Sequence, residues 1–298
     1  MKIFLKLIFI SSLILSAVSV QAQEKIQLKY NFEAGRKLDY EVIIDGDVNI
    51  EVKPSDGRQI PKNSANMQGK FAYTHEIASV NSNGSLAKIN VIYGPSYMNT
   101  IVNNQVIPNT DVPHLNGKIA RVTVSNEGKI SDFELPVGLP ASLQNADFKK
   151  MFLIFPARNL RVGESWMENS ESVNDDNENF SITNTVNSTH TLLGIEKKGG
   201  YECAKVKILA STSTITKSKN SQLKLDGNAQ GRVEGMIYFE LASGYIVYSD
   251  LNTKINNIVV TQTAIEGENQ DKKVPEVTTI LDTNLKTLTK LLSKEENN

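Results

Sequence analysis

The stretch "GRVEGMIYFELASGYIVYSD" at residues 231–250 predicts a β-hairpin. Val233, Ile237 and Phe239 occupy alternate positions, so an extended strand would place them on one face. Ser243 and Gly244 follow this run, and glycine supplies the positive φ angle that a tight hairpin turn requires. A second apolar run begins directly after the turn. This hairpin sets the pattern for the rest of the chain.

Period-two alternation recurs in "FAYTHEI" at 71–77 and in "LAKINVIY" at 86–93. Turn pairs such as Asn83-Gly84 and Asp226-Gly227 separate these runs. Strands with this alternation and tight turns are typical of antiparallel sheets with one buried face. The sequence therefore predicts a mainly β protein.

The chain also contains similar segments in the same order, which predicts an internal repeat. The matching pairs are 32–40 with 160–168, 73–91 with 188–208, and 117–132 with 231–250. These matches predict two related antiparallel β modules, a first over 23–139 and a second over 157–298. Their apolar faces could pack as a sandwich or join as curved sheets.

Two segments are ambiguous or differ from this pattern. In "ASLQNADFKKMFLIF" at 141–155, Phe148, Phe152 and Phe155 fall on one helical face between two prolines. This spacing predicts a short amphipathic helix that connects the modules over 140–156. The C-terminal segment after residue 276 has leucines that suit a helix, but its alternating threonines favour a strand that ends near Leu291.

The first 22 residues predict a signal peptide: two lysines, then an apolar run too short to span a bilayer, and cleavage before Gln23. We therefore expect export to the periplasm or the extracellular space. No cysteine follows the apolar run, because Cys203 is the only cysteine in the chain, so no N-terminal lipid anchor is expected. No transmembrane segment is expected after cleavage.

The composition argues against nucleic acid and anionic membranes as partners, and against stabilisation by disulfides. The formal net charge is −1, so no electrostatic attraction to nucleic acid or to an anionic membrane is expected. One cysteine cannot form an internal disulfide, so packing must supply the stability. A chain of this size buries enough surface to do so.

Motifs that carry chemistry are few. The three histidines form no metal-binding spacing, and the chain has no Gly-x-Ser-x-Gly sequence and no phosphate-binding glycine loop. Cys203 alternates with lysines and is better explained as a small apolar residue. Trp166 is either an anchor of its strand or a stacking surface for a ligand. The sequence thus predicts no enzyme, no metal and no cofactor.

Several motifs resemble a family of exported β-proteins from Gram-negative envelopes that carries only a domain-of-unknown-function label. They are Y-x-F-x-x-G at 30–35, N-G-x-x-A-x-I-x-V-x-Y at 83–93, "FPARNLRVGESW" at 155–166 and G-x-I-x-Y-S at 244–249. The resemblance implies an envelope location and no established activity. At the level of fold alone, a curved sheet with a covering helix is similar to half-barrel periplasmic lipoprotein carriers.

Two functions fit these observations. The first is a non-catalytic envelope protein that binds an apolar or amphipathic, lipid-like ligand on a curved sheet. Phe71, Tyr73, His75 and His190 are the candidate ligand-facing residues, although each histidine could simply be hydrogen-bonded on a half-buried strand. The alternative is a structural or interaction module that docks on another envelope protein. An unrecognised hydrolase is the third and weakest possibility.

Overall fold

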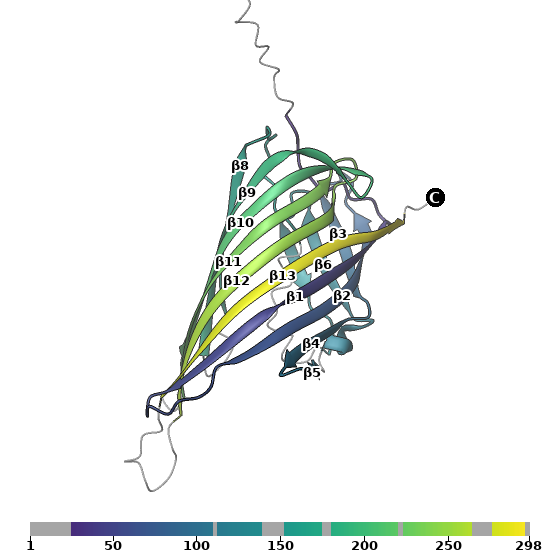
Figure 1. Cartoon of the computed structure of the whole chain (residues 1–298). Helices are drawn as coiled ribbons and strands as arrows, with labels where there is room; N and C mark the ends of the chain where they lie inside the picture. Colours follow the sequence, from purple (N-terminus) through teal and green to yellow (C-terminus); the bar gives the residue numbers. More distant parts are fainter. Residues whose placement is uncertain are drawn as a thin grey trace, which may run out of the picture.

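The computed structural model describes residues 25–109, 112–138, 152–174, 180–219, 223–263 and 276–295 (Figure 1). Its strands are β1 (Lys37–Pro54), β2 (Asn63–Val80), β3 (Leu86–Tyr93), β4 (Tyr97–Val102), β5 (Gln105–Pro108), β6 (Ile119–Ser125), β7 (Ile130–Glu134), β8 (Ser165–Asn174), β9 (Phe180–Lys198), β10 (Tyr201–Ser218), β11 (Leu223–Glu240), β12 (Tyr245–Thr263) and β13 (Val277–Glu295). A single 3₁₀ turn, η1 (Val112–Leu115), is the one helical element among the described residues. The prediction of a mainly β protein is confirmed.

All the strands belong to one antiparallel sheet. Its main path runs β7-β6-β3-β2-β1-β13-β12-β11-β10-β9-β8, and the β4–β5 hairpin pairs with β2 beside this path. Consecutive strands are mostly neighbours, as hairpin turns require. Strand β13 pairs with β12, which precedes it, and also with the distant β1, so that it lies between the two. Of the arrangements that the sequence left open, the structure has a curved sheet.

The C-terminal segment is a strand and not a helix. Strand β13 pairs with β1 along its whole length, from Lys37 opposite Glu295 to Pro54 opposite Val277, and with β12 on its other side. Its threonines alternate with leucines, and β-branched residues fit a pleated surface. The strand continues to Glu295, four residues beyond the predicted end near Leu291.

The predicted connecting helix over 140–156 falls largely on 139–151, which lie outside the described residues. Its last five residues, 152–156, form no helix. Residues 23–139 and 157–298 contribute strands to the same sheet, joined where β1 pairs with β13. The division into two related modules stays a prediction.

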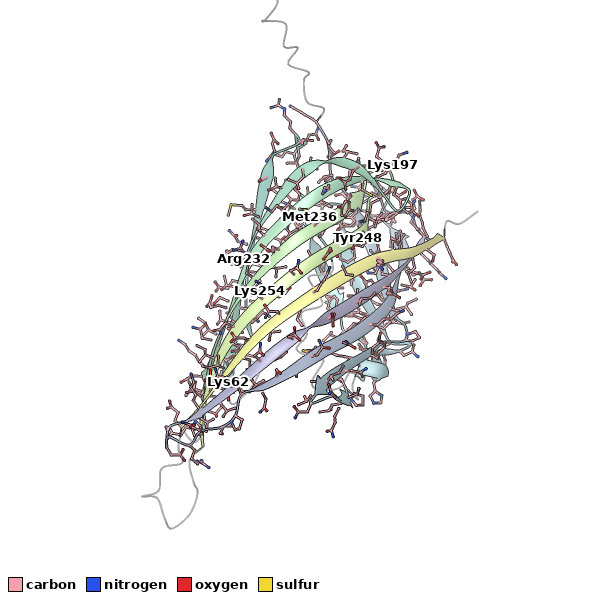
Figure 2. All side chains as sticks on the ribbon, viewed as in Figure 1. Lys62, Lys197, Arg232, Met236, Tyr248 and Lys254 are labelled. Atoms are coloured by element: carbon pink, nitrogen blue, oxygen red, sulfur yellow. The ribbon has the colours of Figure 1, made fainter. Side chains whose placement is uncertain are left out.

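The sheet is strongly curved, so that β3, β6 and β7 lie behind the long strands (Figure 1). Figure 2 shows Arg232, Met236 and Lys254 on the outer face of the long strands. Because side chains alternate along a strand, Val233 and Ile255 face inward. Alternation therefore gives the sheet a largely polar outer face and an inner face rich in apolar side chains.

The main core fills the inner face at the end of the sheet where β3, β6 and β7 curl round. It includes fully buried Val91, Val122, Val206 and Phe239. The N-terminal segment before β1 inserts here: the Tyr30 amide donates to Asn126 O at 2.8 Å. It passes between the β6–β7 and β11–β12 turns, so two sheet regions close around one extended segment.

The rest of the inner face carries side chains that are only half-buried and belong to neither cluster of buried residues. We call this surface the inner groove, and its members are Val48, Ile50, Val52, Phe180, Ile182, Val186, Leu225, Val233, Thr253, Ile255, Val259, Leu281, Thr283 and Leu285. Polar or small inner-face residues such as Asn184, Ala229 and Asn257 lie between some of them, and the alternate strand positions face outward.

Two glycines allow neighbouring strands to approach closely. A Cβ added at Gly235 would lie 2.0 Å from the Asp250 carbonyl oxygen, and one at Gly46 would lie 2.0 Å from that of Asn284. Glycine inside a strand often marks such a bend. Because both contacts are to backbone, the sheet cannot keep this geometry with any other residue.

We expect Gly235→Ala to lower the free energy of unfolding by about 1–3 kcal/mol, since the methyl group forces the two strands apart. Urea denaturation measures the change. Gly227→Ala is the matched control in the same strand: its Cβ would meet the Thr216 side chain at 3.3 Å. Equal stability of Gly235→Ala and wild type would contradict the proposed strand approach.

Candidate functional site

A cavity of about 210 Å³ lies where the inner groove meets the core, and we call it the upper cavity. Strands β1, β2 and β12, the N-terminal segment and the β11–β12 turn line it. Leu251 and Thr289 are the lining residues nearest to the groove. On β12, the next inner-face residue after Leu251 is Thr253, a member of the groove. The cavity and the groove are therefore parts of one inner surface.

An aromatic cluster surrounds His75 in this cavity. The ring centroid of His75 lies 5.1 Å from those of Tyr40 and Tyr73 and 5.4 Å from that of Phe152. The sheet register produces this cluster, because Tyr40 pairs with Tyr73 and Leu38 pairs with His75. Alternation then places all four side chains on the inner face.

The cavity disfavours charge of either sign. Burial lowers the pKa of His75 to about 4, so the imidazole is neutral at pH 7, and its Nε2 has no hydrogen-bond partner. Burial also raises the pKa of Tyr30, Tyr40 and Tyr73 well above the usual range, because a phenolate would be desolvated.

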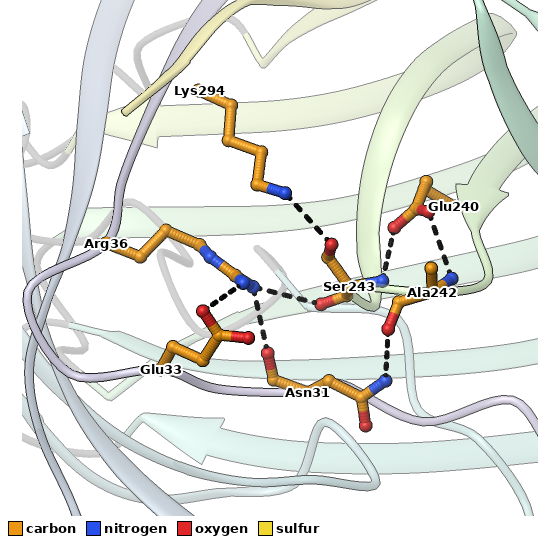
Figure 3. Close-up of polar contacts among 7 residues, drawn as sticks. All are labelled: Asn31, Glu33, Arg36, Glu240, Ala242, Ser243 and Lys294. Atoms are coloured by element: carbon orange, nitrogen blue, oxygen red, sulfur yellow. Dashed lines mark hydrogen bonds and ion pairs between the residues drawn. The ribbon is translucent and has the colours of Figure 1, made fainter. Parts of the chain in front are cut away.

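Arg36 is the charged side chain of the upper cavity, and it is only 3% exposed. Figure 3 shows its guanidinium paired with Glu33 and donating to Asn31 O at 3.1 Å and to Ser243 O at 3.4 Å. Its Nε has no partner. The pair with Glu33 neutralises the guanidinium charge at the cavity wall.

The β11–β12 turn beside Arg36 is held by its own polar contacts (Figure 3). The Glu240 carboxylate accepts from the amides of Ala242 at 3.0 Å and Ser243 at 2.5 Å. Lys294 Nζ is 3.0 Å from Ser243 Oγ, which ties the turn to the end of β13. These contacts hold the Ser243 carbonyl oxygen in the position where it accepts a hydrogen bond from Arg36.

The structure brings together three of the four predicted ligand-facing residues. Tyr73 and His75 line the upper cavity, and Phe71 precedes them on the same face of β2, half-buried against the core. His190 is separate: it lies on β9 opposite Trp166, with ring centroids 5.1 Å apart. The two histidines therefore do not converge on one site.

The two histidines nevertheless lie in matching local structures. Gly35 (φ 85°) donates its amide to Ile77 O at 2.7 Å, and Gly163 (φ 89°) donates to Leu192 O at 2.7 Å. Each acceptor lies two residues after a histidine. The similarity agrees with the segments aligned in the sequence, while a duplicated origin stays a prediction.

The surroundings of Trp166 and Cys203 indicate that both residues have structural roles. The indole Nε1 of Trp166 donates to Ile154 O at 2.8 Å, and the ring is 8% exposed. Cys203 is fully buried, and desolvation raises the pKa of its thiol to about 11. The thiolate needed for nucleophilic chemistry is therefore strongly disfavoured.

Sequence reasoning missed the contribution of the N-terminal segment and of Arg36. Tyr30 and Phe32 line the cavity and belong to the Y-x-F-x-x-G motif at 30–35, which marked this segment without indicating its place. Arg36 follows the positive-φ Gly35 and carried no signal of its own. Burial of a charged side chain cannot be read from one sequence.

A second hollow, of about 260 Å³, lies at the far end of the inner groove. Its apolar walls include Phe180, Ile182, Leu225 and Val259, with small residues between them. The inner groove thus has a hollow at each end. Among the described residues, no three His, Cys, Asp or Glu side chains gather as a metal site would require, and no helix is long and apolar enough to cross a membrane.

Comparison with known proteins identifies no family. No family model and no curated protein matches the chain. Similarity to solved structures is weak, as three of them show. OpdQ of Pseudomonas aeruginosa is 5% identical, with a TM-score of 0.18 over 86% of this chain and 97% of that one. OccK11 (OpdR) of Pseudomonas aeruginosa is 6% identical, with a TM-score of 0.19 over 91% and 100%. The outer membrane protease OmpT of Escherichia coli is 6% identical, with a TM-score of 0.18 over 87% and 97%.

These comparisons correct one prediction and leave another without support. One similar structure is a protease, so the prediction that the chain is not an enzyme is withdrawn. A TM-score of 0.18 in turn assigns no activity to this chain. None of the three structures is a lipoprotein carrier, and the likeness to such carriers gains no support from them.

We expect the free energy of unfolding to fall as the pH drops from about 6.5 to about 4. Burial lowers the pKa of both His75 and His190 to about 4, so below pH 6.5 the unfolded state binds more protons than the folded one. The loss is on the order of 3 kcal/mol per histidine. Urea titrations across this pH window measure it.

His75→Phe and His190→Phe should each flatten this pH dependence, because phenylalanine keeps a ring and does not titrate. His114→Phe, at an exposed position on η1, is the control and should leave the slope unchanged. If the two variants at buried sites keep the full wild-type slope, the buried histidines are not its source.

Proposed function

We propose that this protein is an exported envelope protein that binds an apolar or amphipathic, lipid-like molecule on the inner face of its curved sheet. The inner groove carries the proposal: its aliphatic side chains are half-buried and lie outside the core clusters. An extended apolar surface that a protein leaves uncovered commonly serves for binding. The predicted signal peptide over 1–22 supports the location.

The dimensions of the groove suit a long chain. From Leu225 to Val233, the groove follows strand β11 for roughly 26 Å at about 3.3 Å per residue. One leaflet of a bilayer offers its acyl chains about 15 Å, half of the hydrocarbon thickness. The groove can therefore cover an acyl chain along its whole length, with the upper cavity left for the end that carries polar atoms.

The residues that line the groove favour reversible binding of a ligand and would not pack into a permanent hydrophobic core. Threonines such as Thr253 and Thr283 interrupt the aliphatic surface, and small residues such as Gly231 keep it shallow. A groove of this kind gives area for contact without enclosing the ligand. The energy of burial, about 25 cal/mol per Å² of apolar surface, then scales with the length of the bound chain.

Native mass spectrometry of the protein purified from its own envelope, followed by organic extraction, is the direct test. A mass excess that extraction removes, with a recovered apolar molecule, would support the proposal and identify the ligand class. A bare polypeptide mass that stays bare after incubation with extracted envelope lipids would count against it.

Thr253→Lys is expected to weaken binding of the uncharged fluorophore Nile red at least about tenfold, because it places a charge in the inner groove. Thr253 is half-buried outside the core, so the variant should fold. Asn252→Lys is the matched control on the neighbouring, outward-facing position of β12, and should bind as wild type does. Equal binding by both variants would place the bound dye elsewhere.

A second function, docking on another envelope component, rests on the edge strand β8. It pairs only with β9 among the described strands, and its Met167 and Val173 are 69% and 58% exposed. An unpaired edge is a ready template for strand addition. Crosslinking from Met167 in the intact envelope tests this alternative, and capture of one defined partner strand would favour it.

A further inference from the structure

The upper cavity contains hydrogen-bonding atoms that nothing in the described structure satisfies. Two of them, His75 Nε2 and Arg36 Nε, belong to side chains that are 7% and 3% exposed. A buried polar atom without a partner costs about 1–3 kcal/mol, which a bound polar group would recover. Both residues line the same cavity, so a ligand in it would lie beside both.

The electrostatics of the cavity set the charge of that group. Arg36 is its charged side chain, and the Glu33 carboxylate already pairs with the guanidinium. The other polar lining comes from uncharged groups, including the hydroxyls of Tyr40, Tyr245 and Ser249. An anion entering this site would lose its hydration and would meet a cation that is already neutralised.

We propose that the upper cavity binds the uncharged, hydrogen-bonding end of the ligand, a hydroxyl or an ester, and discriminates against carboxylates and phosphates. This inference rests on the proposed function and specifies the class of molecule in the groove: long-chain alcohols and neutral esters in preference to fatty acids or anionic phospholipids.

The geometry gives each partner a defined role. Arg36 Nε–H is a donor, and a hydroxyl or ester oxygen accepts from it. Neutral His75 presents either a donor or an acceptor at Nε2, and a hydroxyl can match both. The rings of Tyr40, Tyr73 and Phe152 surround the imidazole and exclude water from the contact.

The ionisation behaviour of the lining agrees with this assignment. Burial shifts the pKa of the cavity tyrosines upward and the pKa of His75 downward, and each shift favours the uncharged form. A site that suppresses both phenolates and an imidazolium also penalises a bound carboxylate. Desolvation is the first cause in each case, so the effect belongs to the cavity and not to one neighbour.

Displacement of Nile red by cetyl alcohol and by palmitate at neutral pH tests the inference, because the two chains have the same length and differ at one end. We expect cetyl alcohol to displace the dye at a concentration about tenfold lower than palmitate. Equal or stronger displacement by palmitate would overturn the inference while leaving the proposed function intact. Failure of Nile red to bind would overturn both.

The variant Glu33→Gln tests whether Arg36 takes part in this preference. Glu33 is 64% exposed, so its substitution should leave the fold unchanged while removing the charge that neutralises Arg36. We expect the preference for cetyl alcohol over palmitate to shrink about tenfold or to reverse. Glu134→Gln is the matched control: it breaks the exposed ion pair with Arg121 at 3.2 Å and should keep the wild-type preference. If Glu33→Gln keeps the wild-type preference for cetyl alcohol over palmitate, Arg36 does not contact the polar end of the ligand.

Discussion

The antiparallel ladder between β1 and β13 is the interaction on which the rest of the structure depends. It joins residues 37–54 to residues 277–295, and it connects the strands from the first part of the chain to those from the second. Without it, β1 and β13 would each present a long unpaired edge. The ladder also sets the register that places Tyr40 beside Leu291 and Val48 beside Thr283 on the inner face. The inner groove therefore exists as one surface only because this pairing holds.

Curvature divides that inner face into a closed part and an open part. At one end, β3, β6 and β7 curl round and the N-terminal segment fills the space between two turns, so aliphatic and aromatic residues become fully buried. At the other end no described element covers the sheet, and side chains of the same types stay half-buried. The upper cavity lies at the boundary. There the aromatic surroundings of the core meet the open groove, and Arg36 and His75 are buried without full hydrogen bonding.

Local patterns in the sequence were sufficient for the strands and their turns. Alternation in 86–93 and 233–239 identified β3 and part of β11, and Gly84 and Gly244 have the positive φ angles that the turns required. Long-range pairing could not be obtained this way, because nothing local specifies that 277–295 lies between β1 and β12. For the same reason the sequence grouped His190 with Tyr73 and His75. Alternation placed Tyr73 and His75 on one face of their strand, but the distance between β2 and β9 depends on the path of the whole sheet.

The position of β13 in the chain has a consequence for folding. Strand β1 is made early, yet its partner on one side consists of residues 277–295, so the sheet cannot become continuous until that distant segment is available. Pairing between segments so far apart in sequence requires closing a long loop, which makes folding slow. The native sheet can therefore form only after residues 277–295 have been synthesised and can pair with both β1 and β12.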